Sequence, residues 1–432
     1  MSESRPILII GAGLAGLRCA LALQEQGIPY LLLDKASGPG GRIRTDSVDG
    51  FRLDRGFQVL LTGYPEVRST FDMAALDLHP FRAGALIRRG GTFHRLSDPF
   101  RHPADTLRTL FAGIGTLRDK VRILTLRRTV RSSGVSEQGH RPAGRSIRDS
   151  LEKRWGFSRD MIDGFFRPFL GGITLDADLQ SDEAFFTFVM RMFSEGHAAL
   201  PAGGMQNLPD QLAARLDASR LMWNTEVVRI EGNHSVVLAD GQRLEGAHVV
   251  LSTDMHAAAE LGTAGNERGW NGTSCVYFAS DEAPVSEPVL VLDGEPDDAV
   301  HAACRINSVV VPSLVAPGYA PEGRHLINVS CVGLASGSDS DLEAAIRDRM
   351  RTWFGPSVSA WKHLRTYHIP RALPSQQAGT LTREALPFHV SADGPVVCGD
   401  HVTTSSINGA LASGRAAATY LIENLALRAP AS

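Results

Sequence analysis

The sequence has few cysteines, and they do not group. The five residues stand at Cys19, Cys275, Cys304, Cys331 and Cys398, and no Cys-x-x-Cys pair occurs. This scatter argues against a disulfide framework or a zinc site, so we expect core cysteines, no metal site and a cytoplasmic protein.

Long apolar runs are also missing. No stretch approaches 18 uninterrupted apolar residues, and the N-terminus lacks the basic segment, apolar run and cleavage site of a secretory signal. The nucleophile-elbow, P-loop and His-Glu-x-x-His motifs do not occur either. The 432 residues, 43% hydrophobic and 21% charged, are typical of a globular protein with two or three domains.

The charge is small overall but uneven. Residues 82–148 contain 15 Lys plus Arg and 4 Asp plus Glu, a net of +11, which leaves −14 for the remainder of a chain whose net charge is −3. Residues 107–124 also have apolar side chains at helical spacing, so a basic amphipathic helix is expected there. It suits peripheral contact with anionic lipid, although a solvated basic face is an equal alternative. No nucleic-acid-binding module is recognisable, so no nucleic-acid partner is expected.

The N-terminal segment carries a nucleotide-binding pattern. An apolar strand, residues 7–10, precedes Gly11, Gly13 and Gly16, whose spacing permits a tight turn, close approach of a pyrophosphate and close packing of helix on strand. A helix to about Gln26 and a strand over residues 30–33 follow, and the strand ends at Asp34, an acid at the position that typically binds a ribose hydroxyl. The sequence therefore predicts a dinucleotide site.

The rest of the chain changes character twice. Residues 56–200 are expected to be mainly helical, whereas short strands and turns dominate after Pro201. "GPVVCGD" near the end predicts another buried strand, and the helix after it begins in small residues. The fold class is therefore α/β.

These motifs together resemble the flavin-dependent amine oxidase superfamily, which includes phytoene desaturases and protoporphyrinogen oxidases. The resemblance lies in "GAGLAGL", Asp34, "GPGGRIRT", residues 201–253 and "VVCGDHVTTSSINGALASGRAAA". It implies bound FAD and a Rossmann-like FAD-binding domain assembled from residues 1–60, 200–265 and 375–432. An interleaved α+β substrate-binding domain would comprise a helical part, 61–199, and a strand-rich part, 266–374.

The resemblance also implies which residues contact FAD, with the pyrophosphate along Gly41 and Arg42, the adenine at the backbone of Val227 and the flavin at the start of the last helix. The full expected set is Gly11, Gly13, Leu14, Ala15, Gly16, Asp34, Lys35, Gly41, Arg42, Val227, Gly399, Asp400, Ser406, Ile407, Asn408 and Ala410.

Catalytic residues are less determined. Gln58, in "RGFQVLL", resembles a segment near the flavin, and Tyr367, His368 and Arg371, in "RTYHIPRALP", resemble one that lines the substrate cavity. Amine-oxidising members of this superfamily often have a lysine that holds a water near the flavin and an aromatic pair that brackets the amine. Lys362 is the only late candidate for the lysine, and its setting does not match. The aromatic pair is not evident. A cluster of aromatic residues and methionines suits a lipophilic tunnel or an ordinary core: Phe165, Phe166, Phe169, Phe185, Phe186, Phe188, Met190, Met192 and Phe193.

The leading hypothesis is an FAD-dependent oxidoreductase that dehydrogenates a bulky hydrophobic substrate, polyene or porphyrinogen-like, by hydride transfer to flavin N5. Oxygen or a quinone would accept the electrons. Two alternatives stay open: an FAD-dependent amine oxidase, and a flavoprotein without net redox turnover, such as an isomerase or a binding scaffold.

Overall fold

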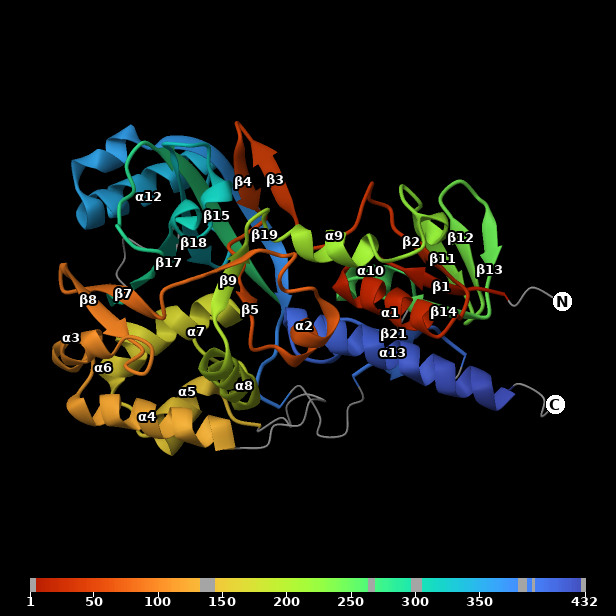
Figure 1. Cartoon of the computed structure of the whole chain (residues 1–432), viewed down its shortest axis with the longest axis horizontal. Helices are drawn as coiled ribbons and strands as arrows, with labels where there is room; N and C mark the ends of the chain where they lie inside the picture. The colour runs from red at the N-terminus through yellow and green to blue at the C-terminus, as the bar shows by residue number, and fades with distance from the viewer. Residues whose placement is uncertain are drawn as a thin grey trace.

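The computed structural model describes residues 5–132, 144–262, 269–296, 305–379, 387–390 and 393–428. It is an elongated molecule with two halves (Figure 1), and both chain ends lie in the same half. Each half is built around its own β-sheet.

The half that holds the termini contains a six-stranded sheet, parallel except for one edge strand. Its strands, in spatial order, are β10 (Leu221–Met222), β2 (Tyr30–Leu33), β1 (Ile7–Ile10), β14 (His248–Leu251), β21 (Val396–Val397) and β20 (His389–Val390). The central strand β1 pairs with β2 on one side and β14 on the other, so distant parts of the sequence meet in one sheet. The apolar run at residues 7–10 is a fully buried strand, as predicted.

Helices cover one face of this sheet, and a small sheet covers the other. Ile7 and Ile9 pack with helices α1 (Leu14–Glu25) and α13 (Ile407–Arg428). The alternate side chains Leu8 and Ile10 pack instead against the antiparallel strands β11 (Val227–Glu231), β12 (Ser235–Leu238) and β13 (Arg243–Glu245).

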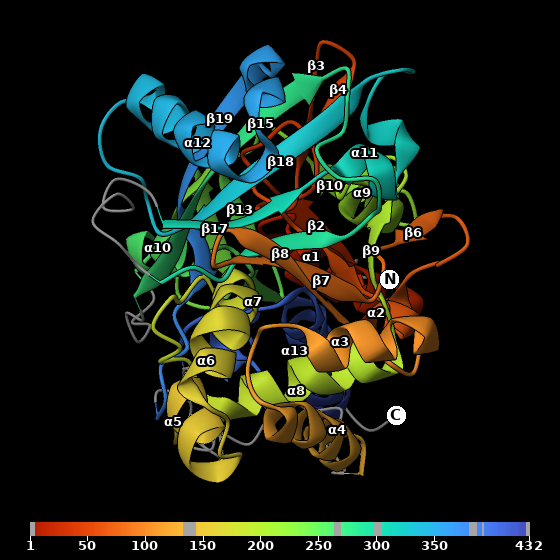
Figure 2. The same cartoon turned by 90° about the vertical axis from the view of Figure 1, so that its left-hand side faces the viewer.

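The other half contains a seven-stranded sheet with helices on both faces. Its strands, in spatial order, are β19 (Lys362–Pro374), β15 (Trp270–Ser280), β18 (His325–Val332), β17 (Arg305–Val310), β16 (Leu290–Asp293), β7 (Gly84–Arg89) and β8 (Thr92–Ser97). Helix α12 (Asp339–Phe354) packs on one face. Helices α7 (Arg167–Thr174) and α8 (Glu183–Glu195) lie on the other (Figure 2).

Residues 61–199, expected to be mainly helical, contain strands as well. This segment also contributes β7 and β8 to the large sheet, and β6 (Leu78–Pro80) and β9 (Ala198–Pro201) to a small sheet with β5 (Leu60–Leu61). Strand β7 pairs with β16, about two hundred residues later. Because that pairing is non-local, local periodicity could not reveal it.

The helix expected over residues 107–124 is two helices. They are α3 (Thr106–Phe111) and α4 (Leu117–Ser132), separated by a turn in which Gly115 has a φ of +63°. The apolar side chains Leu107, Phe111, Leu117 and Val121 face solvent rather than the core.

The cysteine expectation needs one correction. Cys19, Cys275 and Cys398 are free and buried, but Cys331 in β18 is disulfide-bonded. Spacing along the chain does not show which thiols a fold brings within bonding distance. Within the described ranges, no helix is both long and apolar enough to cross a bilayer.

Candidate functional site

A single cavity of about 1290 Å³ runs from the carboxyl ends of β1 and β2 into the space between the seven-stranded sheet and α7 and α8. Its lining includes Gly11 and Asp34 at one end and Phe165 and Leu292 at the other. Small-molecule sites commonly occupy about 300–1,000 Å³. The cavity therefore has room for a cofactor and a second molecule.

The glycine turn after β1 forms one end of the cavity. Gly11 has a φ of +103°, and the Ser252 hydroxyl donates hydrogen bonds to the carbonyl oxygens of Ile10 and Gly11, both at 2.8 Å. The Asp34 carboxylate accepts from the backbone N–H of Ala12 at 2.6 Å. The turn is thus fixed by the ends of two neighbouring strands.

The same turn leaves open space where a pyrophosphate would lie. A Cβ added at Gly13 would meet no atom within 4 Å, whereas a Cβ at Gly41 would lie 3.5 Å from the Gly13 Cα. Gly41, with a φ of +60°, therefore lines the opposite side of a narrow backbone cradle at the start of α1. A helix N-terminus with glycine backbone exposed fits the phosphates of a dinucleotide.

Arg42 and Asp400 join distant segments beside this cradle. The Arg42 guanidinium donates to the Asp400 carboxylate and, at 2.9 Å, to the carbonyl oxygen of Ala372. Burial alone would lower the pKa of Arg42, but the Asp400 carboxylate outweighs it and raises the pKa above its usual value. Gln58 donates to the carbonyl oxygens of Arg42 and Arg55, both at 3.1 Å, and so supports the segment.

Most of the residues expected at FAD lie together in the cavity wall. Fourteen of the sixteen line it: Gly11, Gly13, Leu14, Ala15, Asp34, Lys35, Gly41, Arg42, Val227, Gly399, Asp400, Ser406, Ile407 and Ala410.

Gly16 and Asn408 lie behind the wall. A Cβ at Gly16 would stand 1.9 Å from the Gly11 carbonyl oxygen, so this glycine permits close helix packing, as the motif predicts. The side-chain oxygen of Asn408 accepts from the backbone N–H of Glu66 at 3.1 Å, in helix α2 (Pro65–Thr70). Asn408 thus joins two helices instead of lining the cavity.

Three of the four catalytic candidates lie outside the cavity lining, which is a correction for this set. The Tyr367 hydroxyl donates a hydrogen bond to Asp46 at 2.7 Å. The two ring nitrogens of His368 form hydrogen bonds with the side chains of Ser274 and Asp339. Arg371 is exposed. Sequence resemblance placed the strand correctly, since Ile369 lines the cavity, but it did not give the direction of each side chain. Gln58 does line it.

The far end of the cavity is an apolar chamber. Six of the nine clustered aromatic and methionine residues line it, namely Phe165, Phe166, Phe169, Phe185, Met190 and Phe193. The other three, Phe186, Phe188 and Met192, are buried core residues outside the lining. Sequence reasoning missed the sheet side of the chamber, which includes Ala85, Leu96, Leu290, Leu292 and Asn307. The sequence signal for these residues was the alternation of side chains along short strands, and this periodicity is too weak to single them out.

The chamber reaches the surface beside α3 and α4, where Phe100 and Leu124 both line the cavity and are 65% and 42% exposed. Arg127 donates to Asp98 at 2.6 Å, and its guanidinium lies 4.3 Å from the centre of the Phe100 ring. Arg101 lies in the loop next to Phe100 and donates hydrogen bonds to the carbonyl oxygens of Phe193 and Gly196, which connects this loop to the end of α8.

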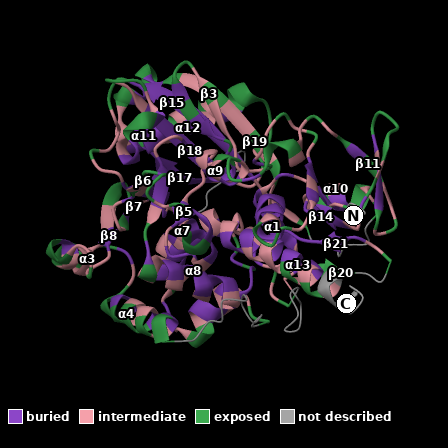
Figure 3. Cartoon of the chain, turned by 45° about the vertical axis from the view of Figure 1, so that its right-hand side comes forward, coloured by how far each residue is buried: buried purple, intermediate pink, exposed green. Residues whose placement is uncertain are grey.

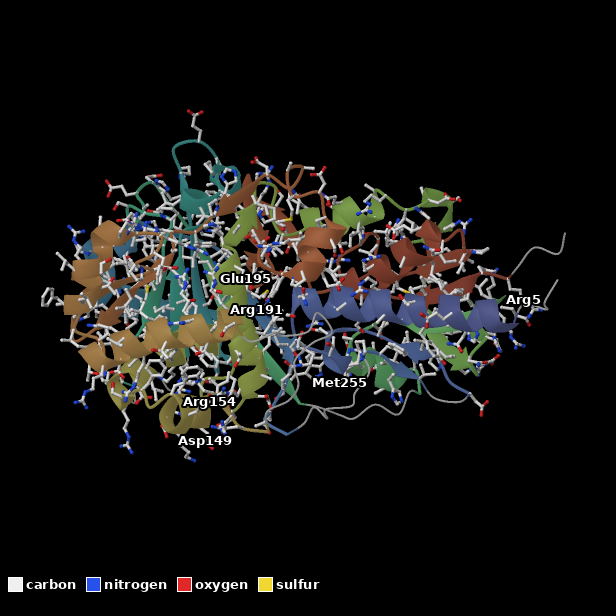
Figure 4. All side chains as sticks on the ribbon, turned by 60° about the horizontal axis from the view of Figure 1, so that its bottom comes forward. Arg5, Asp149, Arg154, Arg191, Glu195 and Met255 are labelled. Carbon is white, nitrogen blue, oxygen red and sulfur yellow. The ribbon has the colours of Figure 1, made fainter. Side chains whose placement is uncertain are left out.

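The end of α8 is itself held by an ion pair. Arg191 and Glu195 pair at 2.7 Å, one helical turn apart, and Figure 4 shows them close together on the helix. The mouth of the chamber is therefore framed by anchored elements.

Among the described residues, no three His, Cys, Asp or Glu side chains are grouped as metal ligands. The open cradle at Gly13, the strand-end acid and the long cavity fit FAD. Fold and site together define the class of FAD-dependent oxidoreductases.

Comparisons with known proteins agree. The profile of the family described as "Flavin containing amine oxidoreductase" matches residues 14–422. The chain belongs to this family and uses FAD as its cofactor.

Curated relatives match over short regions. A phytoene desaturase (lycopene-forming) from Pantoea ananas is 36% identical over 77 residues, 18% of this chain and 15% of that protein. Protoporphyrinogen oxidase 2 from Arabidopsis thaliana is 23% identical over 172 residues, 39% of this chain and 32% of that protein. The matches thus span less than a third of these relatives' lengths.

Solved structures share the fold over nearly the whole chain. An oxidoreductase from Methanosarcina mazei has a TM-score of 0.70 at 18% identity, covering 97% of this chain and 100% of that one. Wild-type putrescine oxidase bound to putrescine has a TM-score of 0.69 at 17% identity, covering 97% and 99%.

Proposed function

We propose that this FAD-dependent oxidoreductase dehydrogenates a bulky, mainly apolar molecule, polyene or porphyrinogen-like, held in the chamber between α7, α8 and the seven-stranded sheet. Oxygen or a quinone accepts the electrons. The observation that carries the proposal is the chamber lining, in which Phe165, Phe169, Met190 and Phe193 face Leu290 and Leu292. Such a surface favours a hydrocarbon body over a small polar one.

The FAD contacts proposed from the sequence agree with this placement. Gly13 and Gly41 would border the pyrophosphate, Asp34 the ribose, and the start of α13 at Ser406 and Ile407 the flavin. When bound, FAD supplies a two-electron acceptor at flavin N5. Gln58 is the remaining positioning candidate, since it lines the cavity and supports Arg42.

Amine oxidation has less support. An unpaired carboxylate would favour an ammonium substrate, yet the lining carboxylate at the chamber mouth, Asp98, is paired with Arg127 and lies 3.6 Å from Arg101. Lys362 stands at the exposed start of β19 and pairs with Asp49 at 3.3 Å. Neither residue is placed to serve an amine in the chamber.

The proposed division into domains follows from which segments build each sheet. We propose that residues 1–60, 200–265 and 375–432 form the FAD-binding domain, because they supply the six-stranded sheet and its helices. Residues 61–199 and 266–374 would form the substrate-binding domain. Peripheral membrane contact through the basic region 82–148 is part of this proposal, and its residues 133–143 lie outside the described residues.

The test begins with the visible spectrum of the purified protein, followed by anaerobic reduction and reoxidation. Restoration of the oxidised flavin bands faster by a soluble quinone than by air would support a desaturase-like enzyme, and lipophilic substrates would then be screened. Fast reoxidation by air with amine-dependent peroxide release would favour amine oxidase. Product formed only with reduced flavin and no acceptor consumption would indicate an isomerase, and a scaffold would give no turnover.

A further inference from the structure

The strongest unexplained surface feature is a cluster of exposed apolar side chains at the chamber mouth. Of the ten large apolar residues exposed in the described structure, six lie between residues 100 and 124. They are Phe100, Leu107, Phe111, Leu117, Val121 and Leu124, with exposures from 42% to 82%. A gathering of exposed large apolar side chains in one segment is typical of an interaction site. We call these six side chains the mouth face.

Five of the six side chains of the mouth face belong to α3 and α4, and Phe100 lies in the turn before them. Figure 1 shows α3 and α4 at the same end of the molecule, and Figure 3 shows exposed segments on both. The exposed apolar residues of α4, Leu117, Val121 and Leu124, are spaced as one solvent-facing stripe. Arg128 and Arg131 continue the same stripe at spacings of four and three residues, so its outer half is cationic.

Positive charge around the mouth face is only partly compensated, by the pairs Arg122–Asp119 and Arg127–Asp98. Residues 106–132 contain seven Lys and Arg but one acidic residue, Asp119, which is fully buried. Elsewhere in the basic region the arginines are largely paired, for example Arg89 with Asp160 and Arg95 with Glu287. Four exposed arginines of α3 and α4 have no acidic partner among the described residues: Arg108, Arg118, Arg128 and Arg131. The face therefore complements an anionic surface.

The helices are held with these side chains outward. Lys120 donates to the carbonyl oxygens of Leu110 and Ala112, at 2.7 and 2.8 Å, and so fixes the end of α3. Asp119 accepts from the backbone N–H groups of Thr116 and Ser158, at 2.7 and 2.9 Å, and fixes the start of α4. The exposed stripe is thus part of an anchored surface.

We infer that the mouth face docks on an anionic lipid bilayer and that apolar substrate enters the chamber from the bilayer between Phe100 and Leu124. A second copy of the chain fits less well, because a two-fold contact would bring the unpaired arginines of both copies together. This docking deepens the membrane contact included in the proposed function and is argued from the surface chemistry of the mouth face, whereas the identity of the entering molecule rests on the proposed function.

The test uses full-length, FAD-loaded protein and vesicle flotation. Vesicles contain phosphatidylcholine alone or with about one-third phosphatidylglycerol, at low and high salt. We expect flotation with anionic vesicles, weakened by salt. Leu117→Ser/Val121→Ser should reduce partitioning about tenfold or more, and Arg128→Gln/Arg131→Gln should reduce it on anionic vesicles. Matched controls elsewhere, Leu334→Ser and Arg229→Gln/Arg351→Gln, should leave it unchanged.

A second measurement protects the test against misfolded variants. An environment-sensitive dye is attached to Val121→Cys, and its emission should shift to shorter wavelength when anionic vesicles are added. The same dye on Leu334→Cys should show no such shift. Absence of flotation and of the dye shift would overturn the inference, as would a dimer in sedimentation velocity that Leu117→Ser/Val121→Ser dissociates. Because FAD content is recorded on the same samples and no turnover is needed, failure of the proposed function would be seen separately.

Discussion

Gly13 and Gly16 lie three residues apart at the start of α1 but meet opposite surroundings. A Cβ at Gly13 would contact no protein atom within 4 Å, whereas a Cβ at Gly16 would lie 1.9 Å from the Gly11 carbonyl oxygen and 2.5 Å from the Ser252 hydroxyl. One glycine keeps space for a ligand, and the other keeps two parts of the protein together.

This contrast gives a matched pair of variants. Gly13→Ala should fold with nearly unchanged thermal stability, because its φ of −72° suits alanine, but should lose FAD affinity. Gly16→Ala should destabilise the protein itself by about 1–3 kcal/mol, since backbone must shift. Thermal melting of FAD-free protein and titration with FAD separate the effects. Full FAD affinity in Gly13→Ala would remove the pyrophosphate from this turn.

The sequence could predict this part of the fold because its determinants are local. Strand, glycine spacing, helix and Asp34 lie within about thirty residues, and the structure has β2 over the predicted residues 30–33. Strands β7 and β8 were not predictable in the same way, because their place in the seven-stranded sheet depends on a pairing with β16. Contacts between distant segments leave little trace in local periodicity.

The Arg42–Asp400 ion pair links segments 358 residues apart. Arg42→Gln should leave the Asp400 carboxylate, which is 6% exposed, without its cation and should cost about 1.5–3 kcal/mol of unfolding free energy. Asp400→Asn alone should cost less, because the Arg42 side chain is 34% exposed. The double variant should cost less than the sum of the single variants in urea unfolding. Additive costs would show that the pair does not couple the segments.

The catalytic candidates show that a family resemblance can place a segment without assigning the roles of its individual residues. The segment with Tyr367 and His368 runs past the cavity, yet only Ile369 among these three neighbours lines it. The direction of a side chain depends on register and on bulges, and β19 shifts register against β15 at two places. A sequence pattern does not fix such shifts.

Asp119 should stabilise the mouth face in a pH-dependent way. Burial alone would raise its pKa, but hydrogen bonds from Ser158 and Thr116 outweigh it and lower the pKa to about 2. The contribution of Asp119 to unfolding free energy should thus be complete above about pH 4 and be lost as pH falls toward 2. Comparing wild type with Asp119→Asn by chemical unfolding should show a difference that grows with pH over this range. A pH-independent difference would contradict the assignment.

Asp54 should behave with the opposite sign. Burial raises the pKa of this carboxyl to about 6, despite hydrogen bonds from Thr45, Tyr319 and the backbone N–H of Met205. The folded state therefore keeps a proton that the unfolded chain releases near pH 4, and stability is lost as pH rises from about 4 to about 6. The wild-type minus Asp54→Asn difference in unfolding free energy should fall by ~3 kcal/mol across that window and then level off. A difference that instead rises with pH would mean that the folded protein holds Asp54 as a stabilised carboxylate.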